Sequence, residues 1–178
     1  MKKAQSALEF LMTYGWAFLV ILIMIGALAY FGVLNPQKFL PDRCNFGTQI
    51  NCNTDLVVVK AAINPTVIAR LVNGVGQKIS LTGVTVTTPT VCLGTCTVCL
   101  GDPTTKTCTS ADTNRVDGTN SQQWDNGAPK NLVISCATGT SLSAGTKVRL
   151  DVNGQWLVSG ADAAFAKPVA GEIYASVQ

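Results

Sequence analysis

The feature that most constrains the fold of this chain is an uncharged apolar run near its N-terminus. No charged residue stands between Glu9 and Lys38, and most of the run is Leu, Ile, Met, Ala and Phe. At about 1.5 Å per residue, an α-helix over this run is longer than the ~30 Å hydrocarbon thickness of a bilayer. The pair Asn35-Pro36 is a signal that ends helices. The sequence therefore predicts one long apolar helix that stops near Leu34.

The charges before the run predict an orientation. Lys2 and Lys3 precede it, and no Lys or Arg lies within it, which favours a cytoplasmic N-terminus and places everything after Pro36 outside. One interpretation is a permanent single-span anchor. A second is an ordinary secretory signal peptide with a small-residue cleavage site at 27–29, but its apolar region exceeds the usual ~7–15 residues. A third interpretation takes account of the residues around Glu9.

The overall composition excludes several classes of function. Leaving aside Lys2, Lys3 and Glu9, the chain has 11 Lys and Arg against 9 Asp and Glu, so no basic face for nucleic acid is expected. Histidine is absent, which removes the commonest metal ligand and the usual general base. A Ser-His-Asp triad is therefore excluded. We expect a protein that is not an enzyme and carries no cofactor.

The stretch KKAQSALEFLMTYGW resembles the start of an archaeal type IV prepilin with a class III signal peptide. In that family a prepilin peptidase removes a short basic leader on the cytoplasmic side, before a glutamine that opens a QSxLE(F/Y)-like motif. The resemblance implies cleavage between Ala4 and Gln5, with the apolar helix kept on the mature protein. The residues that it assigns to filament assembly are Ser6, Leu8, Glu9 and Phe10.

Glu9 admits two compatible interpretations. Ser6 followed by Glu9 fits the S-x-x-E capping box, and a carboxylate near a helix N-terminus is favoured by the helix dipole. A carboxylate at the edge of hydrocarbon also needs a positive or donor partner. In a filament, the new α-amine of a neighbouring Gln5 is a candidate for that partner, unless the glutamine cyclises and another donor replaces it. We expect Glu9 to fix the register of assembly.

The resemblance also implies a fold class, partners and a location. The class is α+β, with a long N-terminal hydrophobic helix followed by an immunoglobulin-like β-sandwich head. The implied partners are the prepilin peptidase, the pilus assembly machinery, the cytoplasmic membrane before assembly, and identical subunits in a filament at the cell surface. The chain then divides into a leader (1–4), the helix (5–34), a linker (35–53) and a head (54–178), with an insertion at about 87–130.

The residues of the head by themselves predict a β-rich module. Short β-prone runs recur, and in some of them apolar and polar residues alternate as in half-buried strands. The pairs Asn73-Gly74 and Asn153-Gly154 are predicted turns. The runs are DLVVVKAAI (55–63), TVIARLV (66–72), QKISLTGVTVTT (77–88), KNLVISC (130–136), TKVRLDV (146–152), QWLVSG (155–160) and GEIYASVQ (171–178).

Seven cysteines lie in the part predicted to be extracellular, and the insertion is rich in Thr, Cys, Asp, Asn and Gly, with no predicted strand longer than a few residues. Disulfides are the favoured state outside the cytoplasm. The alternative is a zinc or iron–sulfur site, but the spacing lacks a second CxxC pair. The pair Cys44–Cys52 is favoured, the other connectivities stay open, and one cysteine is left over. The seven are Cys44, Cys52, Cys92, Cys96, Cys99, Cys108 and Cys136.

Other possible sites in the insertion are weaker. Its four aspartates could bind calcium, but they do not follow the D-x-D-x-D-G pattern of a calcium loop. We therefore interpret them as solvated loop residues and predict no metal site. Trp124 is either an exposed adhesive contact or, as we prefer, a buried anchor of the loop. The aspartates are Asp102, Asp112, Asp117 and Asp125.

Taken together, the sequence predicts a structural subunit of an archaeal type IV pilus that polymerises through its helix into a filament for adhesion. Three alternatives stay open. The chain could be a membrane-anchored extracellular binding domain that does not polymerise, an archaellin of a motility filament, or a redox or metal carrier built on the cysteines.

Overall fold

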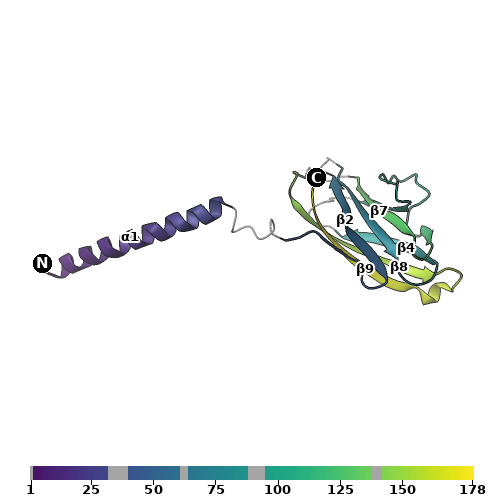
Figure 1. Ribbon diagram of the computed structural model, residues 1–178, viewed down its shortest axis with the longest axis horizontal. Helices are drawn as coiled ribbons and strands as arrows, with labels where there is room; N and C mark the ends of the chain where they lie inside the picture. The colour runs from purple at the N-terminus through teal and green to yellow at the C-terminus, as the bar shows by residue number, and fades with distance from the viewer. Residues whose placement is uncertain (1, 32–39, 61–63, 88–94, 138–141) are drawn as a thin grey trace. The chain divides into compact units, whose positions relative to one another are not determined.

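The chain forms two units in the computed structural model, which describes residues 2–31, 40–60, 64–87, 95–137 and 142–178 (Figure 1). The first unit, Met1–Leu40, contains helix α1, and the second, Pro41–Gln178, is a domain of antiparallel β-sheet that we call the head. The expected α+β class is therefore confirmed. Side chains are described in these ranges except at residues 2–8, 10, 11 and 56.

Helix α1 spans Lys2–Tyr30, a length of 29 residues. Its Leu, Ile, Met and Ala residues have good or acceptable helix propensity, and it contains no proline. The part of the expected helix at 32–34 lies outside the described residues. The predicted N-cap at Ser6 is wrong for the full chain, because residues 2–5 continue the helix and leave Ser6 inside it.

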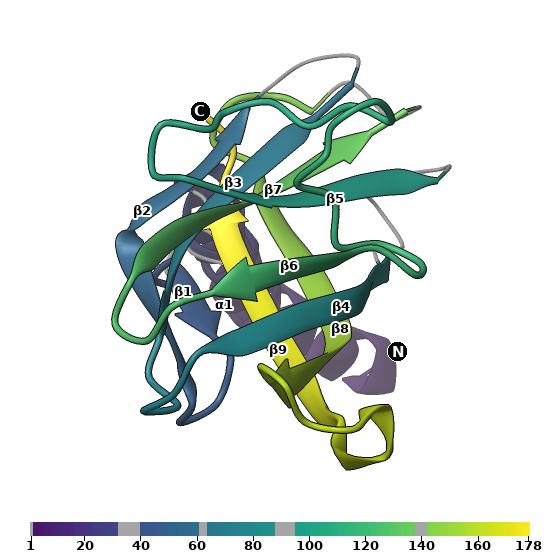
Figure 2. The ribbon, with the colours of Figure 1, turned by 90° about the vertical axis from the view of Figure 1, so that its right-hand side faces the viewer.

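The head contains two sheets whose named strands all pair antiparallel (Figure 2). In spatial order, the five-stranded sheet is β1 (Arg43–Asn45), β9 (Lys167–Ser176), β8 (Lys147–Val158), β4 (Ile79–Thr87) and β6 (Ser121–Trp124). The four-stranded sheet is β2 (Ile50–Lys60), β3 (Thr66–Asn73), β7 (Pro129–Cys136) and β5 (Cys96–Gly101).

Each predicted β-prone run overlaps a strand, but one predicted turn is wrong. Asn153-Gly154 lies inside β8, which joins two predicted runs into one strand of 12 residues. A Cβ on Gly154 would lie 3.1 Å from a methyl carbon of Val84 and 3.4 Å from one of Val169. The glycine at this position therefore allows β4 and β9 to approach β8 closely, which is the other common use of glycine in a strand.

Two segments contain more strand than the sequence predicted. Residues 35–53, the expected linker, include β1 and the first residues of β2. Residues 87–130, the expected insertion, include β5 and β6. In β5, Val98 and Leu100 are buried in the main core, while Cys99 is buried in a separate cluster. The strand alternates as strands do, but its Cys, Thr and Gly residues hide the pattern.

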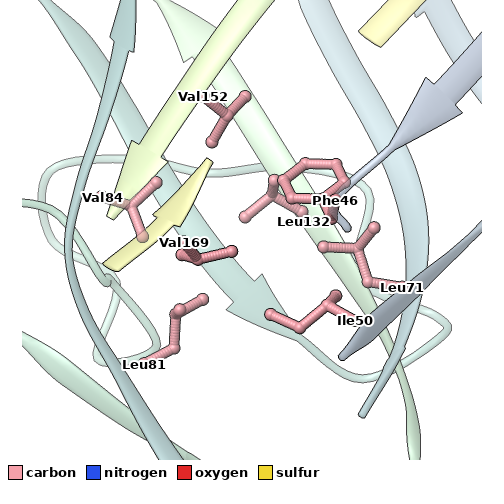
Figure 3. A pocket seen from close by; sticks show the side chains of 8 residues that line it. All are labelled: Phe46, Ile50, Leu71, Leu81, Val84, Leu132, Val152 and Val169. Atoms are coloured by element: carbon pink, nitrogen blue, oxygen red, sulfur yellow. The ribbon is translucent and has the colours of Figure 1, made fainter. Parts of the chain in front are cut away.

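Both sheets bury their facing side chains in one core, which has little free space inside. Eight apolar side chains line a cavity of about 10 Å³, which is at the lower limit for a single water (Figure 3). A cavity of this size has no room for a ligand. Its lining residues are Phe46, Ile50, Leu71, Leu81, Val84, Leu132, Val152 and Val169.

The two sheets are also tied together at their margins. On one side, the Cys44–Cys52 disulfide joins β1 to β2, and the N–H of Gln178 donates to the carbonyl of Val59 at 2.8 Å. On the other side, Val116 donates its N–H to Val98 in β5 and accepts the N–H of Val84 in β4. The hydrogen bonds among these links satisfy some of the backbone groups at strand edges, which otherwise invite aggregation.

Candidate functional site

From Met12 to Tyr30, large apolar side chains are exposed on every side of α1. Trp16, for example, is 69% exposed. A helix that is apolar on every face is stable only where its surroundings are apolar too. The exposed side chains are Met12, Tyr14, Trp16, Phe18, Leu19, Ile21, Leu22, Ile23, Met24, Ile25, Leu28 and Tyr30.

By length and composition, Met12–Tyr30 can cross a membrane, with a mean hydropathy of 2.1. The same features are found in signal sequences and in the core helices of soluble proteins.

The predicted processing and assembly residues all lie in the first turns of α1. Ala4, Gln5, Ser6, Leu8 and Phe10 have helical backbone, and their side chains are outside the described part of the chain. The side chain of Glu9 is exposed, and its backbone carbonyl accepts a hydrogen bond from the Thr13 hydroxyl at 2.9 Å. Glu9 thus carries its carboxylate on the surface of the helix, immediately before the apolar run.

Disulfides, the favoured state for the cysteines, are present in the head. Cys44 is bonded to Cys52, which is the pair that the sequence favoured, and Cys99 is bonded to Cys108. Cys136 is disulfide-bonded as well. Among the described cysteines, Cys96 has a free thiol. Cys92 lies outside the described residues.

The CxxC pair of Cys96 and Cys99 is not arranged as two ligands of one metal. Cys96 packs against the main core, while Cys99 is buried on the other face of β5. The Cys99 and Cys108 sulfurs lie close to an Asp112 oxygen, a grouping that could hold a metal if both sulfurs were thiolates. Because these two sulfurs are bonded to each other, the folded head does not offer them as thiolate ligands.

Cys96 and Cys136 bring a free thiol next to a disulfide. They are directly opposite each other on β5 and β7, with their sulfur atoms 3.7 Å apart. Burial raises the pKa of the Cys96 thiol, because a partly apolar environment disfavours the thiolate. Sequence reasoning missed this pair, because no strand longer than a few residues was expected around Cys96 and only the pairing of β5 with β7 places it opposite Cys136.

The segment after β5 folds onto the outer face of the four-stranded sheet. There the Cys99–Cys108 disulfide packs with Ile68 and Val133 in a small second core. The Arg70 guanidinium donates to the carbonyl of Pro103 at 3.0 Å, which fixes the loop on β3. The described part of the expected insertion is thus tied down by the Cys99–Cys108 disulfide and by hydrogen bonds to the sheet.

The four aspartates of this region are spread over different interactions. Asp112 accepts the N–H of Thr109, Asp117 pairs with Arg115 at 2.8 Å, and Asp125 pairs with Lys78 at 3.0 Å. Asp102 is exposed. Three of them are therefore engaged with different partners rather than aimed at one ion.

Trp124 is fully buried, so the preferred interpretation of it as an anchor is confirmed. Its indole N–H donates to the carbonyl of Ala128 at 2.7 Å. Its own carbonyl accepts a hydrogen bond from Asn73 at 3.0 Å, which connects β6 to the turn after β3. An adhesive role for Trp124 would require the head to open.

A charged cluster surrounds the first residues of the head. Asp42 accepts hydrogen bonds from Lys147 and Ser176, and Glu172 pairs with Arg43 at 2.8 Å. Desolvation is the largest influence on the pKa of Asp42 and raises it, but the hydrogen bonds and the Lys147 charge together lower it below its ordinary value. No sequence pattern predicted this cluster, because its members come from β1 and the residue before it, from β8 and from β9.

Hydroxyl groups line a shallow groove beside the second core, which the sequence also did not predict. The residues that line it include no charged side chain, so a ligand there would be held by hydrogen bonds alone. The hydroxyl-bearing residues of the groove are Thr66, Thr95, Thr97, Thr107, Thr109, Ser110 and Ser135.

No protein-family model matches this chain, and no curated protein is similar to it in sequence.

Proposed function

We propose that the chain is a structural subunit of an archaeal type IV pilus, a surface filament built around the N-terminal helices of identical subunits. This proposal is supported by α1, a helix of 29 residues that is apolar from Met12 to Tyr30 and is attached to a head with its own buried core. In a subunit of this kind, the helix needs an apolar partner, whereas the head folds without a partner.

The proposed sequence of events uses one apolar surface twice. The precursor holds α1 in the cytoplasmic membrane, where the exposed apolar side chains face lipid. The prepilin peptidase then removes residues 1–4, and the pilus assembly machinery transfers the helix into the filament, where the same side chains face copies of themselves. Gly15 and Gly26 would allow neighbouring helices to approach closely, because they carry no side chain.

Glu9 is the residue that distinguishes this proposal from a passive anchor. Inside a bundle of apolar helices, its carboxylate requires a positive or hydrogen-bonding partner. The α-amine of Gln5 in a neighbouring subunit would supply one, or another donor if that glutamine has cyclised. Such a pairing would set the axial position of each subunit.

The disulfides support an extracytoplasmic location for the head, because such bonds persist mainly in oxidising compartments. With Lys2 and Lys3 on the cytoplasmic side, the head would lie outside and later coat the filament. There it would serve adhesion as a binding surface rather than as an enzyme, and nucleic acid is not among its proposed partners.

We further propose that the head is an immunoglobulin-like sandwich. The support is a pair of antiparallel sheets, of five and four strands in the described residues, around one core. The structure determination of the assembled protein, with a comparison of strand connections, would test this.

The mass of the native N-terminus is the first test of the pilin proposal. A mature chain that starts at Gln5 is expected, with or without the mass loss of cyclisation. A chain that retains Met1 would instead indicate a permanent anchor that carries a binding domain, and would overturn the proposal.

The second test replaces Glu9→Gln and counts surface filaments by electron microscopy. We expect few or no filaments, while the membrane still contains the subunit. The matched control is Asp55→Asn, which neutralises an exposed head carboxylate and should leave filament number unchanged. Normal filament number with Glu9→Gln would contradict the register role.

The archaellin alternative predicts a different phenotype for loss of the whole protein. Cells without an archaellin stop swimming, whereas cells without an adhesive pilin still swim but attach poorly to surfaces. Swimming and attachment assays on the same deletion strain separate the two.

A further inference from the structure

Cys96 and the disulfide at Cys136 lie together at one end of β5 and β7. We propose that they form a site of thiol–disulfide exchange, at which Cys136 changes its bonding partner within the folded head. This inference is independent of the role in a filament and rests on the positions of the sulfur atoms.

The distance between the sulfurs is the first observation. The Cys96 S–H group donates to Cys136 Sγ across 3.7 Å, so the attacking atom is already in contact with the sulfur that it would attack. The two residues are paired directly across the strands, and the pairing continues from Thr97↔Ser135 onward. The contact is therefore set by the register of the sheet rather than by a flexible loop.

The backbone geometry is the second observation. Next to the pair, the N–H of Ala137 donates to the carbonyl of Thr95 at 3.3 Å. This bond marks Cys96 and Cys136 as a non-hydrogen-bonded pair, for which opposite Cα atoms are typically about 4.5 Å apart. Disulfides bridge Cα atoms that are about 4.4–6.8 Å apart. A Cys96–Cys136 bond thus fits the sheet without a shift of either strand.

The exchange is balanced and needs no oxidant. The Cys96 thiol loses its proton to solvent, and the thiolate attacks Cys136 Sγ. One S–S bond forms between Cys96 and Cys136 as the existing S–S bond of Cys136 breaks, and the released thiolate takes up a proton. The head keeps the same number of disulfides and of free thiols, but the position of the free thiol changes.

Burial makes Cys96 the favoured attacker. Cys136 is only 3% exposed, so a soluble thiol reaches its sulfur with difficulty, whereas Cys96 is held beside it. The raised pKa of Cys96 keeps most of the thiol protonated at neutral pH, which slows the reaction without preventing it. The other described disulfide of this region, Cys99–Cys108, is packed in the second core on the opposite face of β5.

The test follows the free thiol in the full chain, purified in a non-ionic detergent. The protein is incubated without oxygen at pH 8.5, quenched with acid at intervals, alkylated with N-ethylmaleimide, digested without reduction and analysed by mass spectrometry. We expect a peptide pair linked through Cys96 and Cys136 to appear over minutes to hours, as alkylation moves from Cys96 to a second cysteine. The thiol count per chain should stay constant.

Two outcomes would overturn the proposal. One is alkylation that stays on Cys96 after a day, with no Cys96–Cys136 peptide pair. The other is the appearance of pairs between Cys96 and Cys99 or Cys108 at the same rate, which indicates random exchange after unfolding. A urea-unfolded sample supplies the pattern of random exchange for comparison.

The matched variant is Cys96→Ser, in which the attacking sulfur is absent. Its Cys136 disulfide should keep one partner throughout the incubation, with no newly alkylated cysteine. A change of partner in this variant would count against Cys96 as the attacker. Because the wild-type time course is read by itself, the proposal remains testable if the variant folds poorly.

Discussion

The side-chain amide of Asn131 donates a hydrogen bond to the carbonyl of Pro103 at 2.9 Å, although the two residues are 28 positions apart. The same amide nitrogen also donates to the carbonyl of Thr105 at 2.9 Å. The amide oxygen of Asn131 accepts a hydrogen bond from the Arg70 guanidinium at 3.2 Å. Asn131 is 3% exposed, so one buried amide in β7 holds the loop after β5 on the sheet.

Replacing Asn131→Ala is expected to destabilise the head. The carbonyl of Thr105 would lose its Asn131 donor and the Nε of Arg70 its Asn131 acceptor. Pro103 would keep the Arg70 guanidinium as a donor. A partly buried group left without a partner costs about 1–3 kcal/mol. Thermal unfolding of the full chain in detergent measures the effect. The control Asn153→Ala removes an exposed amide and should change the midpoint little. Equal midpoints for both variants would contradict this role.

Gly171 is expected to tolerate no side chain. A Cβ there would lie 2.2 Å from a ring carbon of Phe46, which is only 5% exposed and has little room to move. Gly171→Ala should therefore lower stability by about 1–3 kcal/mol, as overpacking of a core does. Adding Phe46→Leu should recover part of the loss. Gly26→Ala, which meets no neighbour, is the control, and an equal effect there would refute the prediction.

Asp42 is expected to make the head less stable in acid. Its pKa is lowered in the folded protein, so folding favours the ionised form. That stabilisation is complete above the ordinary pKa of 3.8 and is lost as the pH falls through the lowered folded value. Midpoints of thermal unfolding, measured from pH 6 to pH 2, should therefore differ between wild type and Asp42→Asn near pH 6 and converge near pH 2. A constant difference over the whole range would contradict this, and Asp55→Asn is the control.

The head is expected to fold without α1. All of the described buried apolar residues lie between Phe46 and Val177, so the core is complete in Pro41–Gln178. A chain that starts at Pro41 should be soluble without detergent, monomeric by size-exclusion chromatography with light scattering, and cooperative in unfolding. Aggregation or non-cooperative unfolding would show that the helix contributes to the stability of the head.

The sequence predicted the parts of this protein in which the physical signal is local. The apolar run indicates the helix through its composition alone. The alternation of Val148, Leu150 and Val152 with polar residues indicates β8 through its period of two residues. The Cys44–Cys52 bond was favoured because only a short loop separates the two residues.

The features that the sequence did not predict depend on neighbours distant in the chain. Asn153-Gly154 has the composition of a turn, and only the approach of Val84 and Val169 shows that it belongs inside a strand. The contact between Cys96 and Cys136 likewise depends on the pairing of β5 with β7. In the candidate assembly segment, Ser6 has the right type for a helix cap, but the residues before it extend the helix.

The Cys44–Cys52 bond determines how the head responds to mechanical force. A pull on the chain at Pro41 first reaches β1, a strand of three residues that would peel from β9 easily by itself. Because the disulfide joins Cys44 to β2, the tension passes at once into the second sheet as well. The short loop between the two cysteines is shielded from stretching. A head attached to a long helix thereby resists extension at its point of attachment, where pulling would otherwise begin to unravel it.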